Sequence, residues 1–285
     1  MRYRSDVTLP PDLAAQVACA VREDVGTGDV SAALIPADRA ARAHVLCREA
    51  ATICGAPWFD ETFRQVDPAV AVSWRCAEGA SVTADSIVCE LAGPARALLT
   101  GERIALNFLQ LLSATATVTR RYADAVAGTG CRILDTRKTI PGLRTAQKYA
   151  VRCGGGTNHR IGLYDLVLIK ENHIAAAGGV SAAVQAARSR DAHCRIEVET
   201  ETLTQVREAL DAGADIVMLD NFEPAQMRAA VALKRAHPHP AQLEASGGVT
   251  LAELRAIAET GVDFISVGAL TKNVAAVDLS MRFDL

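Results

Sequence analysis

The sequence predicts an α/β protein made of two parts, a small unit with an antiparallel sheet and a larger unit with a parallel sheet. Two observations lead to this prediction. Short β-like runs separated by Gly, Pro and Asp clusters occupy residues 40–95, whereas β-runs alternate with helical stretches from residue 131 onward. Such alternation is typical of parallel sheets with right-handed crossovers. The strands found after residue 131 suit either a barrel or an open sheet.

The composition is that of an ordinary globular protein, with 285 residues of which half are hydrophobic and 22% are charged. No apolar run reaches the ~20 residues of a membrane span. The first residues, MRYRSDVTLPPDL, carry charges and prolines where a signal peptide has its apolar core. We therefore expect a cytoplasmic protein with no membrane partner.

The charge and the cysteines narrow the class of protein further. The formal net charge is only −3, which argues against general nucleic-acid binding, so no nucleic-acid partner is expected. The eight cysteines are scattered, without a CxxC pair or a zinc-ligand spacing. They are expected to be reduced and mostly buried.

The first part of the chain combines a helix with short strands. Apolar residues recur every four positions over residues 12–25, which predicts a helix (Leu13, Val17, Val21 and Val25). The β-like runs that follow predict a small α+β unit (Ala43–Leu46, Val70–Trp74 and Ser86–Leu91). Residues Arg96–Ala127 are rich in Ala and Leu and contain no proline, so they predict a long helix joining the two parts.

The second part repeats a β-run followed by a helical stretch. The β-runs are Cys131–Leu134, Leu166–Ile169, Arg195–Val198, Asp215–Leu219, Gln242–Glu244 and Phe264–Val267. Helices are predicted at about 178–190, 201–212, 223–236 and 250–260. The last begins with Thr250-Leu-Ala-Glu253, a predicted capping box in which each side chain satisfies a backbone N–H.

Polar residues or glycines follow every predicted strand of this second part. In α/β barrels the active site is built at the carboxyl ends of the strands. Cations come first along the chain, carboxylates in the middle and glycines last, which predicts a site for an anionic substrate. The strand-end residues are Asp135 to Lys138, Lys170 to His173, Glu199, Asp220-Asn221, Ser246-Gly247-Gly248 and Gly268.

The stretch from Asp135 to His173 is unusually basic, with seven Lys or Arg residues against three acids. A basic island on a mildly acidic chain predicts a site for a small, highly charged anion. Arg137 and Arg160 suit carboxylates because arginine binds them with two parallel hydrogen bonds. His159 beside Arg160 is compatible with a structural role or with a role in the site. Arg144, Lys148 and Arg152 share one helix face and are expected to be solvated.

The remaining strand ends predict two further functions, phosphate binding and either acid–base catalysis or metal binding. Ser246-Gly247-Gly248 and Val267-Gly268 are turns before helices, where free backbone N–H groups can hold a phosphate. Glu199 and Asp220 end neighbouring strands and can act as general acid and base or hold Mg²⁺, directly or through water. A nearby phosphate site favours Mg²⁺. The sequence context of Arg103, in the long helix, favours a solvated charge paired with Glu102 or Asn107.

The chain resembles quinolinate phosphoribosyltransferase, the decarboxylating nicotinate-nucleotide pyrophosphorylase of NAD synthesis. The resemblance runs from Glu23-Asp24 to Leu279. Small departures occur at Ile140, Leu111, Ala114 and Lys272-Asn273. The motifs that carry it are Thr136-Arg137-Lys138-Thr139, Pro141-Gly142-Leu143-Arg144, Gly154-Gly155-Gly156 with Asn158-His159-Arg160, Lys170-x-Asn172-His173, Glu197-Val198-Glu199, Glu244-Ala245-Ser246-Gly247-Gly248, Ser266 to Thr271 and Glu102-Arg103.

This resemblance implies an N-terminal α/β sandwich, residues 1–112, and an incomplete, open α/β barrel of parallel strands, residues 113–272, with the tail 273–285 packed on the sandwich. It implies that phosphoribosyl pyrophosphate and quinolinate give nicotinate mononucleotide, CO₂ and pyrophosphate, with Mg²⁺ as cofactor. It also implies a homodimer in which the sandwich of one subunit covers the barrel mouth of the other, so that Arg103 reaches the partner's site.

The resemblance also assigns residues to each substrate. Quinolinate contacts are expected from Arg103, Thr136, Arg137, His159, Arg160 and Lys170. Phosphoribosyl pyrophosphate contacts are expected from Lys138, Asn172, His173, Glu199, Asp220, Ser246, Gly247, Gly248, Ser266, Val267 and Gly268. The expected catalytic residues are Lys138, Lys170, Glu199 and Asp220, and the last two are the expected metal ligands.

Two alternative functions remain open at this point. The first is a related phosphoribosyltransferase that takes nicotinate, or the paralogue associated with molybdenum transport. The second is a non-catalytic regulator that binds a phosphorylated metabolite on the same fold. Two arginines with a histidine and a lysine exceed the needs of a monoacid, and a regulator does not need Lys138, Lys170, Glu199 and Asp220 together.

Overall fold

The computed structural model describes residues 7–284 and divides them between two compact units. The first unit comprises the chain up to Arg120, the segment Thr139–Gly155 and the chain from Ala269 onward, and the second comprises Arg121–Lys138 and Gly156–Gly268. The boundaries expected at 112 and 272 differ from this division because Thr139–Gly155 returns to the first unit. Residues 1–6 and 285, included in the expected domains, lie outside the described residues.

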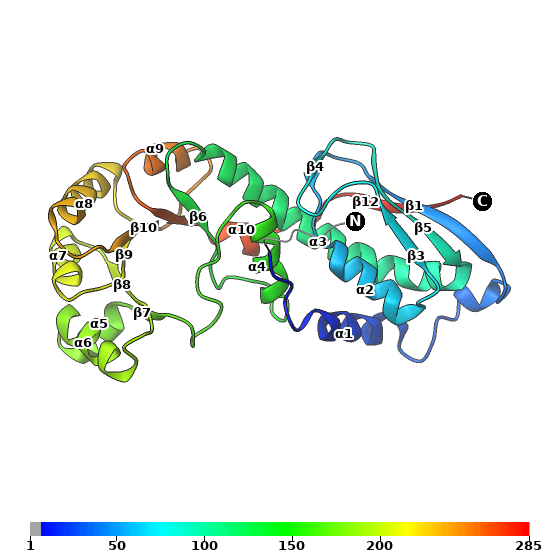
Figure 1. The fold of residues 1–285 in the computed structure, drawn as a ribbon, viewed down its shortest axis with the longest axis horizontal. Helices are drawn as coiled ribbons and strands as arrows, with labels where there is room; N and C mark the ends of the chain where they lie inside the picture. Colours follow the sequence, from blue (N-terminus) through cyan, green and yellow to red (C-terminus); the bar gives the residue numbers. More distant parts are fainter. Residues whose placement is uncertain (1–6, 285) are drawn as a thin grey trace. The chain divides into compact units, whose positions relative to one another are not determined.

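An antiparallel sheet in the strand order β12-β1-β5-β3 forms the first unit's framework (Figure 1). Three of its strands confirm the β-runs predicted from the sequence: β1 (Ala40–Cys47), β3 (Ala71–Trp74) and β5 (Ser86–Pro94). Strand β12 (Leu279–Asp284) pairs with β1, so the C-terminal residues belong to this sheet. A separate two-stranded ladder joins β2 (Ala51–Thr52) and β4 (Ser81–Val82).

Helices of the first unit pack on this sheet through a core that includes Phe59, Phe63, Leu98 and Leu106. The predicted helix at residues 12–25 is confirmed as α1 (Leu13–Val25), and the predicted long helix as α3 (Ala95–Ala125). The other helices are α2 (Ala56–Val66), α4 (Arg144–Cys153), α10 (Ala269–Lys272) and the 3-10 turn η1 (Ala32–Leu34). A Cβ on Gly101 would lie 2.6 Å from the ring of Phe63, so glycine lets α2 and α3 approach closely.

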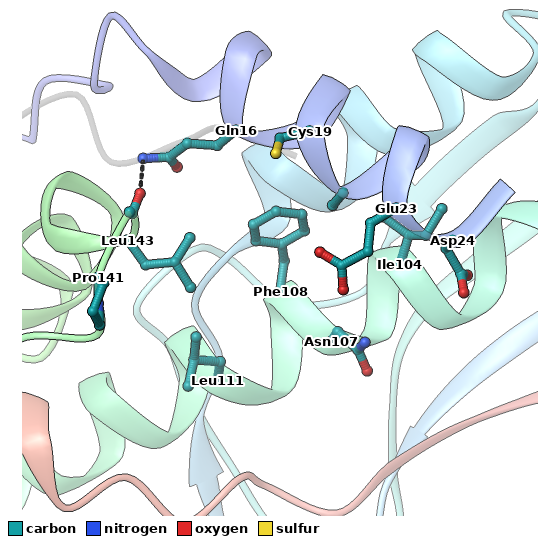
Figure 2. Close-up of a pocket in the computed structure, with 12 residues that line it drawn as sticks. Gln16, Cys19, Glu23, Asp24, Ile104, Asn107, Phe108, Leu111, Pro141 and Leu143 are labelled. Carbon is teal, nitrogen blue, oxygen red and sulfur yellow. Dashed lines mark hydrogen bonds between the residues drawn. The ribbon is translucent and has the colours of Figure 1, made fainter. Parts of the chain in front are cut away.

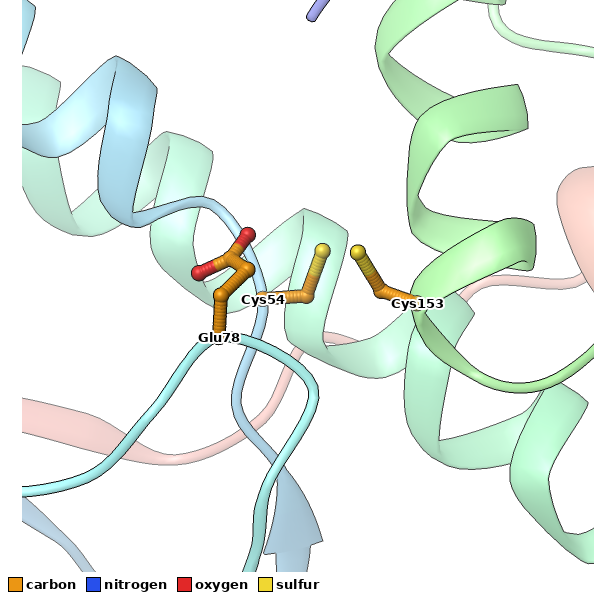
Figure 3. Close-up of side chains that lie close together, drawn as sticks. All are labelled: Cys54, Glu78 and Cys153. Atoms are coloured by element: carbon orange, nitrogen blue, oxygen red, sulfur yellow. The ribbon is translucent and has the colours of Figure 1, made fainter. Parts of the chain in front are cut away.

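A buried carboxylate holds the start of α2 in place. Glu78 is only 2% exposed, and its two oxygens accept hydrogen bonds from the N–H groups of Gly55 (2.8 Å) and Ala56 (3.2 Å). These N–H groups have no helical partner of their own, so Glu78 satisfies them. The thiols of Cys54 and Cys153 point toward one another beside it (Figure 3). Burial raises the pKa of the Cys54 thiol well above its ordinary value, which keeps it protonated.

The second unit confirms the predicted parallel sheet. Its six strands lie in the order β6-β11-β10-β9-β8-β7, and every neighbouring pair is parallel. Because β6 and β7 are the two edges of this order, the barrel is open, as expected. The strands are β6 (Arg132–Leu134), β7 (Val167–Ile169), β8 (Ile196–Thr200), β9 (Ile216–Asp220), β10 (Gln242–Ser246) and β11 (Phe264–Ser266).

Helices follow these strands and flank the sheet (Figure 1). Three of the predicted helices are confirmed as α6 (Val180–Arg190), α7 (Leu203–Asp211) and α8 (Pro224–Ala236), and the unpredicted α5 (Glu171–Ala177) follows β7. The prediction of a helix from residue 250 was wrong in its start, since α9 runs only from Leu254 to Ala258. The Thr250 N–H and hydroxyl both donate to Glu253, so Thr250 does not cap the helix as a capping box requires.

None of the helices in residues 7–284 is both long and apolar enough to cross a membrane. The cysteines of this part of the chain are free thiols, and five of the eight are buried: Cys47, Cys54, Cys89, Cys131 and Cys153.

Candidate active site

A cavity of about 420 Å³ lies in the second unit, at the carboxyl ends of the parallel strands. Strand ends supply most of its wall, as the pattern of polar strand ends predicted. Its lining residues are Thr136, Arg137, Lys138, His159, Arg160, Leu168, Lys170, Glu199, Met218, Asp220, Glu244, Ser246 and Ser266.

Two guanidinium groups line this cavity. Arg137 follows β6, and Arg160 comes from the loop between α4 and β7. Burial, and then the positive charge of Arg137, lowers the pKa of Arg160, which shows that the two cations are close. The Arg160 side chain donates to the Leu166 carbonyl oxygen at 3.5 Å. Two neighbouring arginines suit two carboxylates of one planar ligand.

Two carboxylates face the cavity from adjacent strands, Glu199 on β8 and Asp220 on β9. Burial, and then the negative charge of Glu199, raises the pKa of Asp220, while the positive charges of Lys170 and Lys138 oppose the rise. The Lys170 ammonium group donates to Glu199. Two acids so close that one hinders ionisation of the other fit a divalent cation, which relieves that repulsion.

The glycine turn after β10 has a steric requirement. Gly247 has φ of 105°, and a Cβ there would lie 2.1 Å from the side-chain oxygen of Asn221. Asn221 is itself held by the Ser246 carbonyl oxygen, which accepts from its backbone N–H at 2.9 Å. At the neighbouring turn, a Cβ on Gly268 would lie 3.0 Å from Lys138 Cδ, so this glycine makes room for the lysine stem.

Replacing Gly247 by alanine is expected to destabilise the turn and to weaken binding of phosphoribosyl pyrophosphate, which the family resemblance assigns to this turn. The left-handed backbone costs about 1 kcal/mol for a residue with a side chain, and displacement of Asn221 adds to this. Thermal unfolding measures the loss of stability, and titration with phosphoribosyl pyrophosphate measures the loss of binding. Gly213→Ala is the matched control, because Gly213 has φ of 80° with open space around it. Equal effects of the two substitutions would contradict the steric argument.

His159, in the loop between α4 and β7, contacts two buried carboxylates of the barrel. Its Nε2 lies 2.8 Å from an oxygen of Glu197 on β8 and 3.5 Å from an oxygen of Glu244 on β10. Burial lowers the pKa of His159, but the hydrogen bonds to Glu197 and Glu244 outweigh burial and raise it. Burial, and then the charge of Glu244, raises the pKa of Glu197 to about 7. The histidine thus bridges two buried carboxylates below the cavity.

The structure brings most of the predicted site residues together. The four predicted catalytic residues line the cavity, as do five of the six residues expected to contact quinolinate. Ser246 and Ser266, which are expected to contact phosphoribosyl pyrophosphate, also line it. Gly247, Gly248, Val267 and Gly268 follow these serines in the adjoining turns. Asn172 and His173 lie in the first turn of α5, where His173 Nδ1 accepts from the Lys170 N–H at 2.9 Å. The roles assigned to these residues remain predictions.

Arg103 is exposed on α3 in the first unit. That unit has a cavity of about 380 Å³ between α1, α3 and Pro141–Leu143, lined in part by Ile104 and Phe108 (Figure 2). Glu23 and Asp24 also line it, and their negative charges disfavour an anionic substrate. The cationic cavity of the second unit is therefore the better candidate for the active site.

Sequence reasoning assigned no role to three buried polar residues around the site. Asp135 is 0% exposed and accepts from the Asn158 amide (2.6 Å) and the His159 N–H (2.9 Å). Glu197 and Glu244 were visible in the motifs, and strand alternation places them on the same faces as Glu199 and Ser246. The expectation that Lys148 is solvated was wrong, since it is 1% exposed within α4.

An open α/β barrel with a cavity of cations and paired carboxylates at its strand ends defines an enzyme site for a polyanionic substrate. Comparison with known proteins identifies the family. Residues 29–113 match the family model for the N-terminal domain of quinolinate phosphoribosyl transferase, and residues 115–282 match that for its C-terminal domain. The chain belongs to the quinolinate phosphoribosyltransferase family.

Individual relatives agree with the family models. A probable nicotinate-nucleotide pyrophosphorylase [carboxylating] of Bacillus subtilis is 44% identical over 92% of this chain and 90% of its own length. Quinolinate phosphoribosyltransferase [decarboxylating] 1b of Nicotiana tabacum is 39% identical over 98% of this chain and 86% of its own. The structure of the nicotinate-nucleotide pyrophosphorylase from Francisella tularensis superposes with a TM-score of 0.93 at 44% identity, covering 99% of this chain and 100% of that one.

Proposed function

We propose that this protein transfers the phosphoribosyl group of phosphoribosyl pyrophosphate to quinolinate with decarboxylation, giving nicotinate mononucleotide, CO₂ and pyrophosphate. One observation carries the proposal: four Lys or Arg side chains and two carboxylates at adjacent strand ends line a single cavity (Arg137, Lys138, Arg160 and Lys170, with Glu199 and Asp220). The cations match a dianionic acid and a pyrophosphate, and the acids match the sugar and a metal ion.

The chain's groups divide between the two substrates. Arg137 and Arg160 hold the carboxylates of quinolinate and orient its ring nitrogen toward the anomeric carbon. The turns after Ser246 and Ser266 hold the 5′-phosphate through backbone N–H groups. Lys138 stabilises the departing pyrophosphate. Glu199 and Asp220 hold the ribose hydroxyls or the divalent cation.

Mg²⁺ is the proposed cofactor, held by Glu199 and Asp220 directly or through water. When bound, it supplies positive charge to the leaving pyrophosphate. The ring nitrogen becomes cationic once it is ribosylated. It can then accept the electrons of the carbon–carbon bond that breaks as the adjacent carboxylate leaves as CO₂, and a proton replaces the carboxylate. Lys170 stabilises the negative charge that develops.

The working form is proposed to be a cytoplasmic homodimer in which Arg103 of one subunit completes the site of the other. The exposure of Arg103 on α3 supports this arrangement. A guanidinium from the partner would add a further bidentate contact to the dianion.

The protein is expected to turn over quinolinate and to discriminate against nicotinate. A monoacid would leave part of the arginine pair without a carboxylate, and an unpaired buried group costs about 1–3 kcal/mol. The kcat/KM for quinolinate should therefore exceed that for nicotinate at least tenfold. Assays with each acid, phosphoribosyl pyrophosphate and Mg²⁺, following CO₂ release, test this. Comparable kcat/KM values would favour the nicotinate-type alternative, and no turnover of either acid would favour the regulator.

A further inference from the structure

Two fully buried carboxylates lie inside the barrel, below the proposed active site. Glu197 is two residues before Glu199 on β8, and Glu244 is two residues before Ser246 on β10. Strand alternation therefore points them into the barrel one step deeper than the site residues. Both are 0% exposed. Barrel interiors are usually filled by Val, Ile and Leu, and burying a carboxylate is costly, so this pair calls for an explanation beyond packing.

His159 connects this pair to the substrate-binding loop. Its Nε2 lies 2.8 Å from Glu197 and 3.5 Å from Glu244, while its Nδ1 accepts a hydrogen bond from the Arg160 N–H at 2.7 Å. Nδ1 therefore faces the Arg160 backbone, while Nε2 faces the two carboxylates. Both ring nitrogens are thus engaged by the protein itself. The ring is fixed at one end by the barrel and fixes the Arg160 backbone at the other.

The loop that carries His159 and Arg160 needs a fixed point inside the barrel, because the outer part of this loop is exposed. Leu163 and Tyr164 are 75% and 79% exposed. The fixed points lie before them, where Asp135 accepts from the His159 N–H, and after them, where Asp165 accepts from the Ile161 and Gly162 N–H groups. In addition to these backbone contacts, the His159 imidazole reaches the buried Glu197 and Glu244.

We propose that Glu197 and Glu244 are positioning residues that hold His159 and, through its Nδ1, the backbone from which Arg160 reaches the substrate. The inference rests on the proposed function, in which Arg160 binds a carboxylate of quinolinate. A displacement of about 1 Å in such a group can cost a hundredfold in rate. The carboxylate pair accordingly acts on quinolinate through His159, whereas the sugar donor is held by Glu199 and the turn after Ser246, two residues further along the same strands.

The test compares Glu244→Met with Glu244→Gln. Methionine removes one of the two carboxylates that face Nε2 at similar volume, so the KM for quinolinate should rise about tenfold or more while the KM for phosphoribosyl pyrophosphate stays within about twofold. Glu197 still faces Nε2 in this variant, and removing Glu244 relieves the repulsion between the two buried carboxylates, so Tm should not fall. Glutamine keeps an acceptor oxygen for Nε2–H and should stay within about threefold of wild type.

A double-variant cycle shows whether Glu244 acts through His159. His159→Leu should raise the quinolinate KM about as much as Glu244→Met, and the double variant should be no worse than either alone. Glu78→Gln is the matched control, since Glu78 is an equally buried carboxylate in the first unit. It should lower Tm without changing the quinolinate KM. Glu197→Met repeats the test from β8 if Glu244→Met does not fold.

Several results would overturn the proposal while leaving the proposed function intact, because the wild-type enzyme would still turn over quinolinate. These are an unchanged quinolinate KM in the Met variants, a parallel rise of both KM values with a fall in Tm, or additive effects in the cycle. Failure of both Met variants to fold would assign the pair to the fold. A wild-type protein that does not turn over quinolinate would instead refute the proposed function.

Discussion

A mixture of Arg103→Ala and Lys138→Ala proteins is expected to recover activity that neither variant has alone. Arg103→Ala should lose about 90–99% of wild-type activity, since a charge-assisted contact to a carboxylate contributes about 1.5–3 kcal/mol. Lys138→Ala should be similarly impaired because it lacks a cation at the pyrophosphate. If each site takes Arg103 from one subunit and Lys138 from the other, a mixed dimer has one intact site and one doubly defective site.

The recovery should be about half of wild-type activity for each mixed dimer, and roughly a quarter for a randomly exchanged equal mixture. Subunit exchange is confirmed by mass spectrometry of differently labelled chains, and activity is measured before and after exchange. Arg121→Ala, which removes another exposed arginine of α3, should keep wild-type activity and serves as the control. An exchanged mixture that stays inactive would place Arg103 in its own subunit's site or in a purely structural role.

The fold of the second unit was predictable because its sequence pattern is simple. Each parallel strand is a short apolar run, and each carries a polar residue or a glycine where it ends. The first unit was harder. Helix α2 was not predicted, because its stability comes from Phe59 and Phe63 packing in the core and from the Glu78 side chain bonding to its first N–H groups. Glu78 is 22 residues from the start of α2 along the chain, so no local pattern shows the contact.

The residues of the candidate site were likewise predictable only in part. Residues at strand ends, such as Glu199 and Asp220, were found because the ends of parallel strands meet at one edge of a sheet. Glu197 and Glu244 were passed over because a glutamate inside a strand is usually placed on the solvent face. The contacts of His159 with both carboxylates show that these side chains point inward. The assignment of Arg103 required the family resemblance, since α3 carries many polar residues with no distinguishing spacing.

Removing Glu199 or Asp220 is expected to impair use of the sugar donor far more than binding of quinolinate. Both side chains line the cavity at the ends of adjacent strands, next to the turn after Ser246. In Glu199→Ala and Asp220→Ala, the ribose hydroxyls and the divalent cation lose a ligand, so donor affinity with Mg²⁺ should fall at least tenfold. Quinolinate affinity should change little, because the arginine pair remains. Calorimetric titration of each ligand separates the two effects.

The lysine beside Glu199 gives this prediction a second, opposite consequence. Lys170 donates to Glu199, so Glu199→Ala releases its ammonium group toward the cavity. Quinolinate is a dianion, and its affinity for Glu199→Ala can therefore rise slightly while donor affinity falls. Asp220→Ala leaves the Lys170–Glu199 pair in place and should not show that rise. Glu201→Ala, which removes an exposed acid just beyond β8, is the control and should match wild type for both ligands. If either site variant bound the donor and Mg²⁺ normally but lost quinolinate, the carboxylates would belong to the acid-binding end of the cavity.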